Sequence, residues 1–213
     1  MQYDLFAGEH RDVDLGPSAS ILGGFALDVA DALVADIQRM AVTSPFRRME
    51  TRGGRRMSVA MLNCGTVGWV SDRAGYRYDA NDPQTGGAWP AMSPLFLDLA
   101  RRAAAVLGFH DFVPDACLIN RYVPRARLSL HRDMDEQDLD APIVSVSMGL
   151  PATFLWGGDD RSDRITRHLL AHGDVVIWAG PSRMVFHGID ELKDGSHPAT
   201  GAVRYNLTFR KVR

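Results

Sequence analysis

The second half of this chain of 213 residues consists of short strand-like segments separated by turns. Turn residues such as Gly157-Gly158 and Gly180-Pro181 divide runs that are rich in β-branched, aromatic and aliphatic side chains. Many short strands between turn residues are typical of a β-sandwich or β-barrel. The strands are expected at residues 116–123, 127–131, 142–149, 152–156, 174–179, 183–189 and 203–212. A core built from two sheets is therefore predicted for residues 116–213.

Two helices are expected before these strands. Asp28 can cap the first helix, which runs to about Ala41 and carries an apolar stripe at helical spacing. Ser93 caps the second helix, Pro94 occupies its first position, and Gly108 ends it. Two helices can cover one face of a sheet. The fold class is therefore predicted to be α+β and mainly β, with N-terminal helices supporting a double-sheet core.

The remaining segments are expected to lie around this core. Residues 1–17 are polar and contain Gly and Pro, which predicts a loosely ordered leader. Residues 43–92 place strand-like pieces, at 57–62 and 76–78, among Gly, Arg, Asn and Pro. This mixture indicates a lid or a substrate-contacting insertion. The length allows a single large domain or a domain with a small lid, and the whole chain (residues 1–213) is expected to form one domain.

The distribution of charge leaves nucleic-acid binding open. The net charge of −2 gives no global reason for it. Arginines nevertheless gather in two clusters that contain almost no acidic residue, and local basic patches can follow a phosphate backbone. A solvated surface rich in arginine is the alternative. The clusters are Arg39, Arg47, Arg48, Arg52, Arg55 and Arg56, and then Arg121, Arg125, Arg127 and Arg132.

Location is inferred from what the sequence lacks. No apolar run is long enough for a membrane helix, and residues 1–6 do not have the pattern of a signal peptide. Cys64 and Cys117 lie far apart in the sequence, so neither a disulfide framework nor a zinc site is indicated. We expect a cytoplasmic monomer without membrane association.

The final strand carries a charged face. Side chains on a strand alternate between its two sides, and here one side holds Val203, Tyr205, Leu207 and Phe209 while the other holds Arg204, Asn206, Thr208 and Arg210. Charges are rarely buried without a partner. The polar face therefore either lies in water or holds an anion, most simply a carboxylate, which suits the planar fork of arginine.

A metal site is the second chemical hypothesis. His131 and Asp133 are two residues apart, so at a strand end both side chains point the same way. A second histidine would complete the two-His-one-carboxylate set of non-haem Fe(II) oxygenases. His187 is the candidate by elimination, and a satisfied core histidine is the alternative. Such a site leaves open positions for dioxygen and for 2-oxoglutarate, whose distal carboxylate would need Arg204 or Arg210.

Taken together, His131-x-Asp133, His187 and Arg204-x-Asn206-x-x-x-Arg210 resemble the signature of the AlkB-type Fe(II)/2-oxoglutarate dioxygenases, which repair alkylated nucleic acids. Residues 82–85, 89–92, 114–122, 128–131 and 141–147 resemble the same family, so the resemblance covers nearly the whole chain beyond the leader. It implies a double-stranded β-helix (jelly-roll) core with a nucleotide-recognition lid at about residues 43–92.

The resemblance also implies the ligands. Fe(II) would be bound by His131, Asp133 and His187, and dioxygen and 2-oxoglutarate would be co-substrates. The 2-oxoglutarate site would comprise Asn120, Tyr122, Arg204, Asn206 and Arg210, with Arg204 facing the distal carboxylate.

Substrate-binding residues carry over in the same way. Trp69 would stack on an extruded base, with the ring of His131 on the other side. Asp135 would favour N1-methyladenine and N3-methylcytosine, because both are cationic. Tyr76, Arg77 and Tyr78 would contact the backbone, and Arg161 would lie near the pocket. For Trp69 and Tyr76, a core or surface aromatic is the alternative.

The implied function is oxidative demethylation of alkylated bases in single- or double-stranded DNA, with formaldehyde and succinate as products; RNA is an open second substrate. A same-fold oxygenase acting mainly on RNA or on a non-nucleic-acid substrate is the alternative, and a non-catalytic nucleic-acid-binding module is a further one. Three residues beside the expected ligands, Arg127, Arg132 and Met134, would influence how tightly nucleic acid binds.

Overall fold

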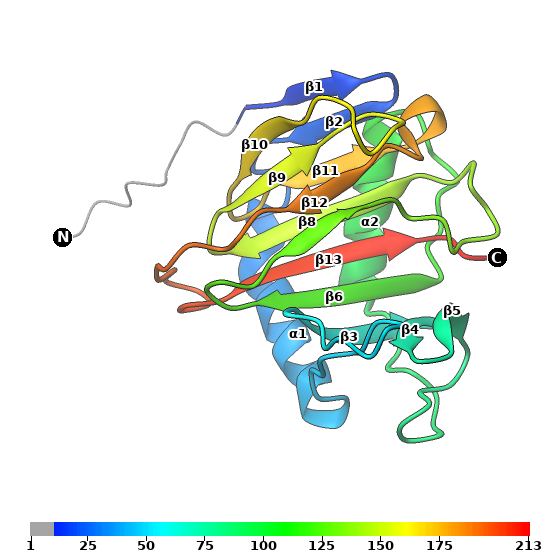
Figure 1. The fold of residues 1–213 in the computed structure, drawn as a ribbon. Coiled ribbons are helices and arrows are strands. Elements are labelled where there is room, and N and C mark those ends of the chain that lie inside the picture. Colours follow the sequence, from blue (N-terminus) through cyan, green and yellow to red (C-terminus); the bar gives the residue numbers. More distant parts are fainter. Residues whose placement is uncertain (1–10) are drawn as a thin grey trace.

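The molecule, a computed structural model that describes residues 11–213, is built mainly from strands (Figure 1). The strands are β1 (Val13–Gly16), β2 (Ala19–Leu22), β3 (Ala60–Gly65), β4 (Gly68–Asp72), β5 (Gly75–Asp79), β6 (Ala116–Tyr122), β7 (Leu128–His131), β8 (Ile143–Gly149), β9 (Ala152–Trp156), β10 (Thr166–Leu170), β11 (Val175–Trp178), β12 (His187–Ile189) and β13 (Arg204–Arg210). The helices are α1 (Ala30–Thr43) and α2 (Pro94–Val106), with short 3-10 turns at Leu27–Val29 and Gly180–Ser182.

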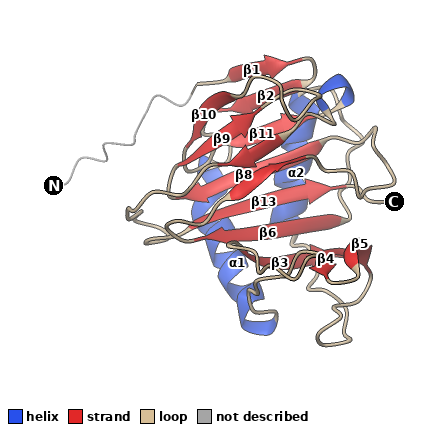
Figure 2. Ribbon diagram, viewed as in Figure 1, coloured by secondary structure: helices blue, strands red, loops and turns tan. Residues whose placement is uncertain are grey.

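Two antiparallel sheets form the centre of the fold. The larger sheet has the strand order β1-β2-β11-β8-β13-β6-β3, and the smaller sheet has the order β10-β9-β12-β7. Strands β4 and β5 form a separate hairpin. Figure 2 shows both helices on one side of the larger sheet. The arrangement confirms the predicted mainly β fold and is that of a jelly roll.

Strand alternation divides the side chains of the larger sheet between two cores. Val144, Val146 and Leu207 pack in the same buried cluster as residues of α1 and α2. The intervening Ser145 and Ser147 project from the other face of β8, toward the smaller sheet. Because β8 and β13 lie in the middle of the sheet, their polar residues on that face are held deep between the two sheets.

The second helix begins as predicted, and the first does not. The backbone N–H of Phe96 donates to the hydroxyl of Ser93 at 3.2 Å, and Pro94 occupies the first turn of α2. Asp28 lies within the 3-10 turn before α1, and no side chain caps α1. The carboxylate of Asp28 instead lies 3.7 Å from the guanidinium of Arg102 on α2. Among the described residues, neither helix combines the length and apolar character needed to span a bilayer.

Two segments that were expected to be peripheral belong partly to the larger sheet. Strand β1 lies within the predicted leader and pairs with β2, while residues 1–10 of that leader fall outside the described residues. Strand β3 lies within the predicted lid, yet it pairs with β6 over its whole length. Strand β3 joins the sheet because a sheet edge recruits strands by pairing, whatever their local composition.

The strand predicted at residues 183–189 is shortened to β12. Gly180 and Pro181 begin a 3-10 turn, and the N–H groups of Ser182, Arg183 and Val185 each bond to the carbonyl three residues back. Residues 183 and 184 therefore form a turn, residues 185 and 186 are irregular, and only His187, Gly188 and Ile189 join the smaller sheet. The structure also contains β10, which was not predicted.

Gly65, at the end of β3, offers a direct test of backbone packing. Its φ is +123°, and a Cβ there would lie 2.3 Å from the carbonyl oxygen of Asp115. Gly75 has a φ of +120° with open space around the same position.

We expect Gly75→Ala to lower the free energy of unfolding by about 1–2 kcal/mol through backbone strain alone. Gly65→Ala should cost roughly 1–3 kcal/mol more through the clash. Urea unfolding of both variants measures the difference, and equal losses would show that the contact with Asp115 relaxes freely.

Candidate active site

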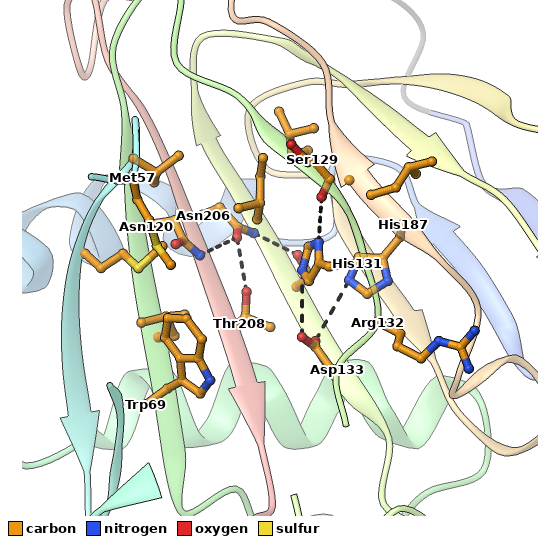
Figure 3. A pocket seen from close by; sticks show the side chains of 18 of the residues that line it. Met57, Trp69, Asn120, Ser129, His131, Arg132, Asp133, His187, Asn206 and Thr208 are labelled. Carbon is orange, nitrogen blue, oxygen red and sulfur yellow. Dashed lines mark hydrogen bonds and ion pairs between the residues drawn. The ribbon is translucent and has the colours of Figure 1, made fainter. Parts of the chain in front are cut away.

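A cavity of about 680 Å³ opens between the two sheets. Its walls combine residues of β6, β8 and β13 from the larger sheet with residues of β7, β9 and β12 from the smaller one. The hairpin β4–β5 contributes Trp69, Tyr76 and Tyr78 at one side. Figure 3 shows the polar side chains of both sheets converging in this space.

Three candidate metal ligands lie together in the cavity. His131 ends β7 and pairs directly with His187, the first residue of β12, while Asp133 follows β7 (Figure 3). Gly188 permits this close pairing, since a Cβ there would lie 2.7 Å from the carbonyl oxygen of Leu128. One ligand atom from each of the three residues lies within 4.8 Å of the others. Nε2 of His131 lies 3.8 Å from Oδ1 of Asp133, and Nε2 of His187 lies 3.9 Å from Oδ2 of Asp133.

Hydrogen bonds orient both imidazole rings toward this point. Nδ1 of His131 lies 2.9 Å from the carbonyl oxygen of Ser129, and Nδ1 of His187 lies 3.1 Å from that of Val185. A carbonyl oxygen only accepts, so each Nδ1 carries the proton and donates. Each Nε2 then offers a lone pair toward Asp133, and this tautomer is the one that a metal-ligating histidine needs.

The protonation states also suit a metal. Burial raises the pKa of Asp133, but the guanidinium of Arg210, 2.8 Å away, and the two histidines outweigh burial and hold that pKa below its usual range. Burial, together with the neighbouring His131, lowers the pKa of His187 to about 4. Metal ligands must be a carboxylate and neutral imidazoles, so both groups are in the required state at neutral pH. Two imidazoles and one carboxylate fit Fe(II).

A buried ionic network surrounds Asp133. Nε of Arg210 lies 3.2 Å from Glu136, which also accepts hydrogen bonds from Arg183 at 2.9 Å and from the hydroxyl of Tyr78 at 2.6 Å. Arg183 additionally donates to the backbone carbonyl of Asp133 at 2.6 Å. These contacts connect the metal ligand to β5 and to the turn before β12. Glu136 and Arg183 were not among the predicted site residues, because no local pattern marks them.

The polar face of β13 points into the cavity. All four of its residues, Arg204, Asn206, Thr208 and Arg210, line the cavity and are buried, so this face does not lie in water. Asn206 donates to the hydroxyl of Ser145 at 2.7 Å and accepts from Asn120 and Thr208 at 3.2 and 3.1 Å (Figure 3). Of the two alternatives that the alternation left open, the anion site is the one that burial supports.

Arg204 is a buried cation without an ion pair among the described residues. The residue is 0% exposed; its Cζ lies 5.0 Å from the ring of Tyr122, and the hydroxyl of Ser147 accepts from Nη2 at 3.0 Å. Nε and Nη1 of Arg204, like the hydroxyl of Tyr122 and Oδ1 of Asn120, have no hydrogen-bond partner among the described residues. A buried unpaired charge is costly. A bound carboxylate would satisfy these donors, so the residues fit 2-oxoglutarate.

Most of the predicted substrate residues border the same cavity. Trp69 stacks on Tyr76, with ring centroids 5.6 Å apart, and its indole N–H donates to the carboxylate of Asp135 at 2.8 Å. Arg161 lines the cavity with its guanidinium 5.7 Å from the ring of Phe186. The flanking residues Arg127, Arg132 and Met134 line it as well.

The three predicted backbone contacts differ in their position relative to the cavity. Arg77 does not line the cavity, because neighbours on a strand point to opposite faces; it pairs instead with Asp72 at 3.0 Å and Asp79 at 3.7 Å. Tyr78 lines the cavity, but its hydroxyl is bound to Glu136. Burial raises the pKa of Tyr78 well above its ordinary value. Tyr76 is the member of this trio that is both exposed and at the cavity.

Comparison with known proteins agrees with this architecture. Residues 18–210 match the family described as the 2OG-Fe(II) oxygenase superfamily, and the chain belongs to it. The chain is 56% identical over 210 residues to the alpha-ketoglutarate-dependent dioxygenase AlkB of Escherichia coli strain K12, covering 98% of this chain and 97% of that protein. It therefore belongs, within the superfamily, to the AlkB-type dioxygenases, and is an enzyme that uses Fe(II), 2-oxoglutarate and dioxygen.

Two more distant relatives agree. The human protein named nucleic acid dioxygenase ALKBH1 is 33% identical over 124 residues, covering 58% of this chain and 32% of that protein. The solved structure of OsALKBH1 superimposes with a TM-score of 0.82 at 28% identity, covering 94% of this chain and 100% of that one.

Proposed function

We propose that this dioxygenase oxidatively demethylates N1-methyladenine and N3-methylcytosine in DNA, with RNA as a second substrate class, and releases formaldehyde and succinate. One observation carries the proposal: a single cavity contains the three candidate metal ligands, an unpaired buried guanidinium, and a rim of stacked aromatic rings beside a carboxylate. The names of the relatives, which include a nucleic acid dioxygenase, support the same substrate class.

The roles at the metal end follow from the donor atoms. His131, Asp133 and His187 are proposed to hold Fe(II), which when bound supplies the activation of dioxygen at the expense of 2-oxoglutarate. Arg210 keeps Asp133 ionised and oriented. At the other end, Arg204 is proposed to bind the distal carboxylate of 2-oxoglutarate, with the hydroxyl of Tyr122 as a further donor.

The rim of the cavity is proposed to receive the base. A base must leave the helical stack for its methyl group to be reached, and stacking on an aromatic ring offsets part of that cost. Trp69 is the proposed stacking surface, with His131 on the opposite side, and Asp135 holds the indole in place. Tyr76, Arg161 and the flanking Arg127 and Arg132 are proposed to contact the strand.

The organisation of the chain is part of the proposal. Residues 1–213 are proposed to form one domain, since the cavity is lined jointly by the loop before β3, by β6 and by β13. The monomeric state and the cytoplasmic location stay predictions, to be checked by size-exclusion chromatography with light scattering and by cell fractionation.

Formaldehyde release tests the proposed reaction. We expect the enzyme with Fe(II) to release formaldehyde from oligonucleotides that carry N1-methyladenine or N3-methylcytosine, and only when 2-oxoglutarate is present. Matched DNA and RNA, each single- and double-stranded, rank the substrates. Succinate formation without any formaldehyde from these oligonucleotides would point to another substrate and overturn the proposal.

The carboxylate of Asp135 makes a separate, electrostatic prediction. We expect Asp135→Ala and Asp135→Asn to lower kcat/KM for cationic N1-methyladenine about fivefold more than for a neutral etheno adduct, because an exposed charge pair contributes up to roughly 1 kcal/mol. Asparagine can still accept from the indole of Trp69, so this variant separates charge from positioning. Steady-state kinetics on matched oligonucleotides measure the ratio, and equal losses for both lesions would remove the electrostatic argument.

A further inference from the structure

A second pocket, rich in arginine, lies at the edge of the larger sheet. Its volume is about 460 Å³, and Arg47, Arg48, Arg56 and Arg121 contribute to its lining. These residues come from both of the arginine clusters in the sequence, one before β3 and one at the end of β6. None of the roles proposed above uses this pocket.

Strand pairing brings the two clusters together. Arg47 exchanges backbone hydrogen bonds with Met61, at 3.0 and 2.7 Å, which places the next residue, Arg48, beside Ala60. Ala60 in turn pairs with Arg121 on β6. Arg48 and Arg121 therefore flank Ala60 from neighbouring strands. Ala60, whose side chain is small, lines the pocket together with both arginines.

The positive charge in this pocket exceeds the negative charge. Arg47 is neutralised by Asp82 at 2.7 Å and also donates to Gln84 at 3.2 Å. For Arg48, Arg56 and Arg121, by contrast, the described residues supply no ion pair. Glu50, the acid nearest in sequence to Arg48, lies 3.8 Å from Arg73 instead.

Arg121 adds a second observation that points to a ligand. Its Nε is shielded from solvent and has no hydrogen-bond acceptor among the described residues, and its Cζ lies 5.9 Å from the ring of Phe46. A guanidinium that is held against an aromatic ring with a free donor is prepared for an anion with two or more oxygens, of which phosphate is the best match.

The pocket and the catalytic cavity meet at one residue on the edge of the larger sheet, because Arg121 points to the face of β6 opposite Asn120 and Tyr122. Arg56 lines both spaces, and its backbone is held in a bridge with Glu50. We propose that the pocket binds a backbone phosphate of the strand whose base enters the catalytic cavity, with Arg48 and Arg121 as the two clamping cations. This inference rests on the proposed function, because it requires a nucleic-acid substrate. Free phosphate shares the same chemistry and is the other source to be tested.

The salt dependence of binding tests the inference. A single-stranded oligonucleotide of about 15 nucleotides, within the usual range of single-strand sites, carries one central N1-methyladenine. Binding is measured on the complete enzyme at several salt concentrations, together with turnover of a trinucleotide that carries the same lesion. Replacing both arginines (Arg48→Gln with Arg121→Gln) removes one phosphate contact. The slope of log K against log salt should therefore become shallower by about 0.7. Arg101→Gln, on the exposed side of α2 and outside both pockets, is the matched control and should keep the slope of the parent protein.

The outcomes are distinguishable from failure of the proposed function. If the parent protein neither binds nor demethylates any methylated oligonucleotide, the proposed function fails. If it does both, and the double variant keeps the slope of the parent, the inference fails alone. Turnover of the trinucleotide at the parent rate shows that the variant is folded and its cavity intact; a loss there would assign the arginines to the co-substrate site and overturn the phosphate assignment. Titration with inorganic phosphate distinguishes a free anion from a backbone phosphate. A further outcome is that the double variant loses phosphate binding but still binds the long oligonucleotide as the parent protein does. The pocket would then be a site for a free anion, and the proposal that it binds a backbone phosphate would be overturned.

Discussion

Replacing His131 with alanine is expected to abolish succinate and formaldehyde production while leaving the fold intact. A site with three protein ligands cannot lose one and keep its metal geometry, so the loss should exceed the roughly 10- to 100-fold that removal of a residue supporting the ligands costs. His131 is the ligand to change because its side chain is 35% exposed and its ring is hydrogen-bonded locally, to the carbonyl of Ser129. Few contacts within the fold therefore depend on the His131 side chain.

Asp133 would make a less clean test of the same ligand set. Its carboxylate also holds Arg210 at 2.8 Å, and removing one partner of a buried pair costs roughly 3–5 kcal/mol. Asp133→Ala is therefore expected to lose activity and stability together. The control for His131→Ala is His168→Ala, which changes a histidine on β10 that lies outside the cavity. Anaerobic Fe(II) titration, thermal unfolding and succinate assays on both variants separate the effects. Turnover of His131→Ala at the parent rate, with bound iron, would mean that the metal is held elsewhere.

Periodicity carried much of the site prediction. The alternation in β13 correctly grouped Arg204, Asn206, Thr208 and Arg210 on one face, because side-chain direction on a strand depends only on parity. The same reasoning applied to β8 would have added Ser145 and Ser147, whose hydroxyls bind Asn206 and Arg204.

Parity also explains an expectation that could have been improved from the sequence. Tyr76, Arg77 and Tyr78 are consecutive, so a strand directs the two tyrosines to one face and Arg77 to the other. The structure separates the two tyrosines at the cavity from Arg77 on the opposite face.

Contacts between distant segments were beyond local patterns. The Gly, Arg and Asn residues around β3 predict a lid, yet Cys64 on β3 lies directly opposite Cys117, far along the chain. Glu136 likewise has no periodic neighbour that marks it. Its importance arises only when Tyr78, Arg183 and Arg210 converge on it from three separate elements. Pairing of this kind depends on tertiary packing, which overrides local propensity.

The two ends of the cavity differ in charge balance, and this difference has a consequence for stability. At the metal end, Asp133 and Glu136 face Arg183 and Arg210, so the carboxylates and guanidinium groups match in number. At the other end, Arg204 has the ring of Tyr122 and the hydroxyl of Ser147 but no carboxylate. Burial lowers the pKa of Arg204, which shows that the charged form is held at a cost. The fold therefore maintains an unfavourable charge where a dianionic co-substrate is proposed to place a carboxylate.

Replacing Arg204 with methionine should accordingly have opposite effects on function and on stability. We expect the KM for 2-oxoglutarate to rise roughly 10- to 100-fold, because a hydrogen-bonded pair with a charged group contributes about 1.5–3 kcal/mol. The ligand-free variant should be at least as stable as the parent protein, because an apolar side chain of similar length replaces a buried charge that has no ion-pair partner among the described residues. Added 2-oxoglutarate should raise the melting temperature of the parent and have little effect on the variant.

Arg101→Met on α2 is the control, since it removes an exposed guanidinium outside the cavity and should change neither quantity. Steady-state kinetics at saturating methylated oligonucleotide give the KM, and thermal unfolding with and without 2-oxoglutarate gives the stability. A destabilised Arg204→Met with an unchanged KM would mean that the guanidinium serves the fold through Tyr122 and Ser147. A stable variant with a raised KM would mean that the closing strand keeps its buried arginine for the co-substrate, at the expense of the ligand-free protein.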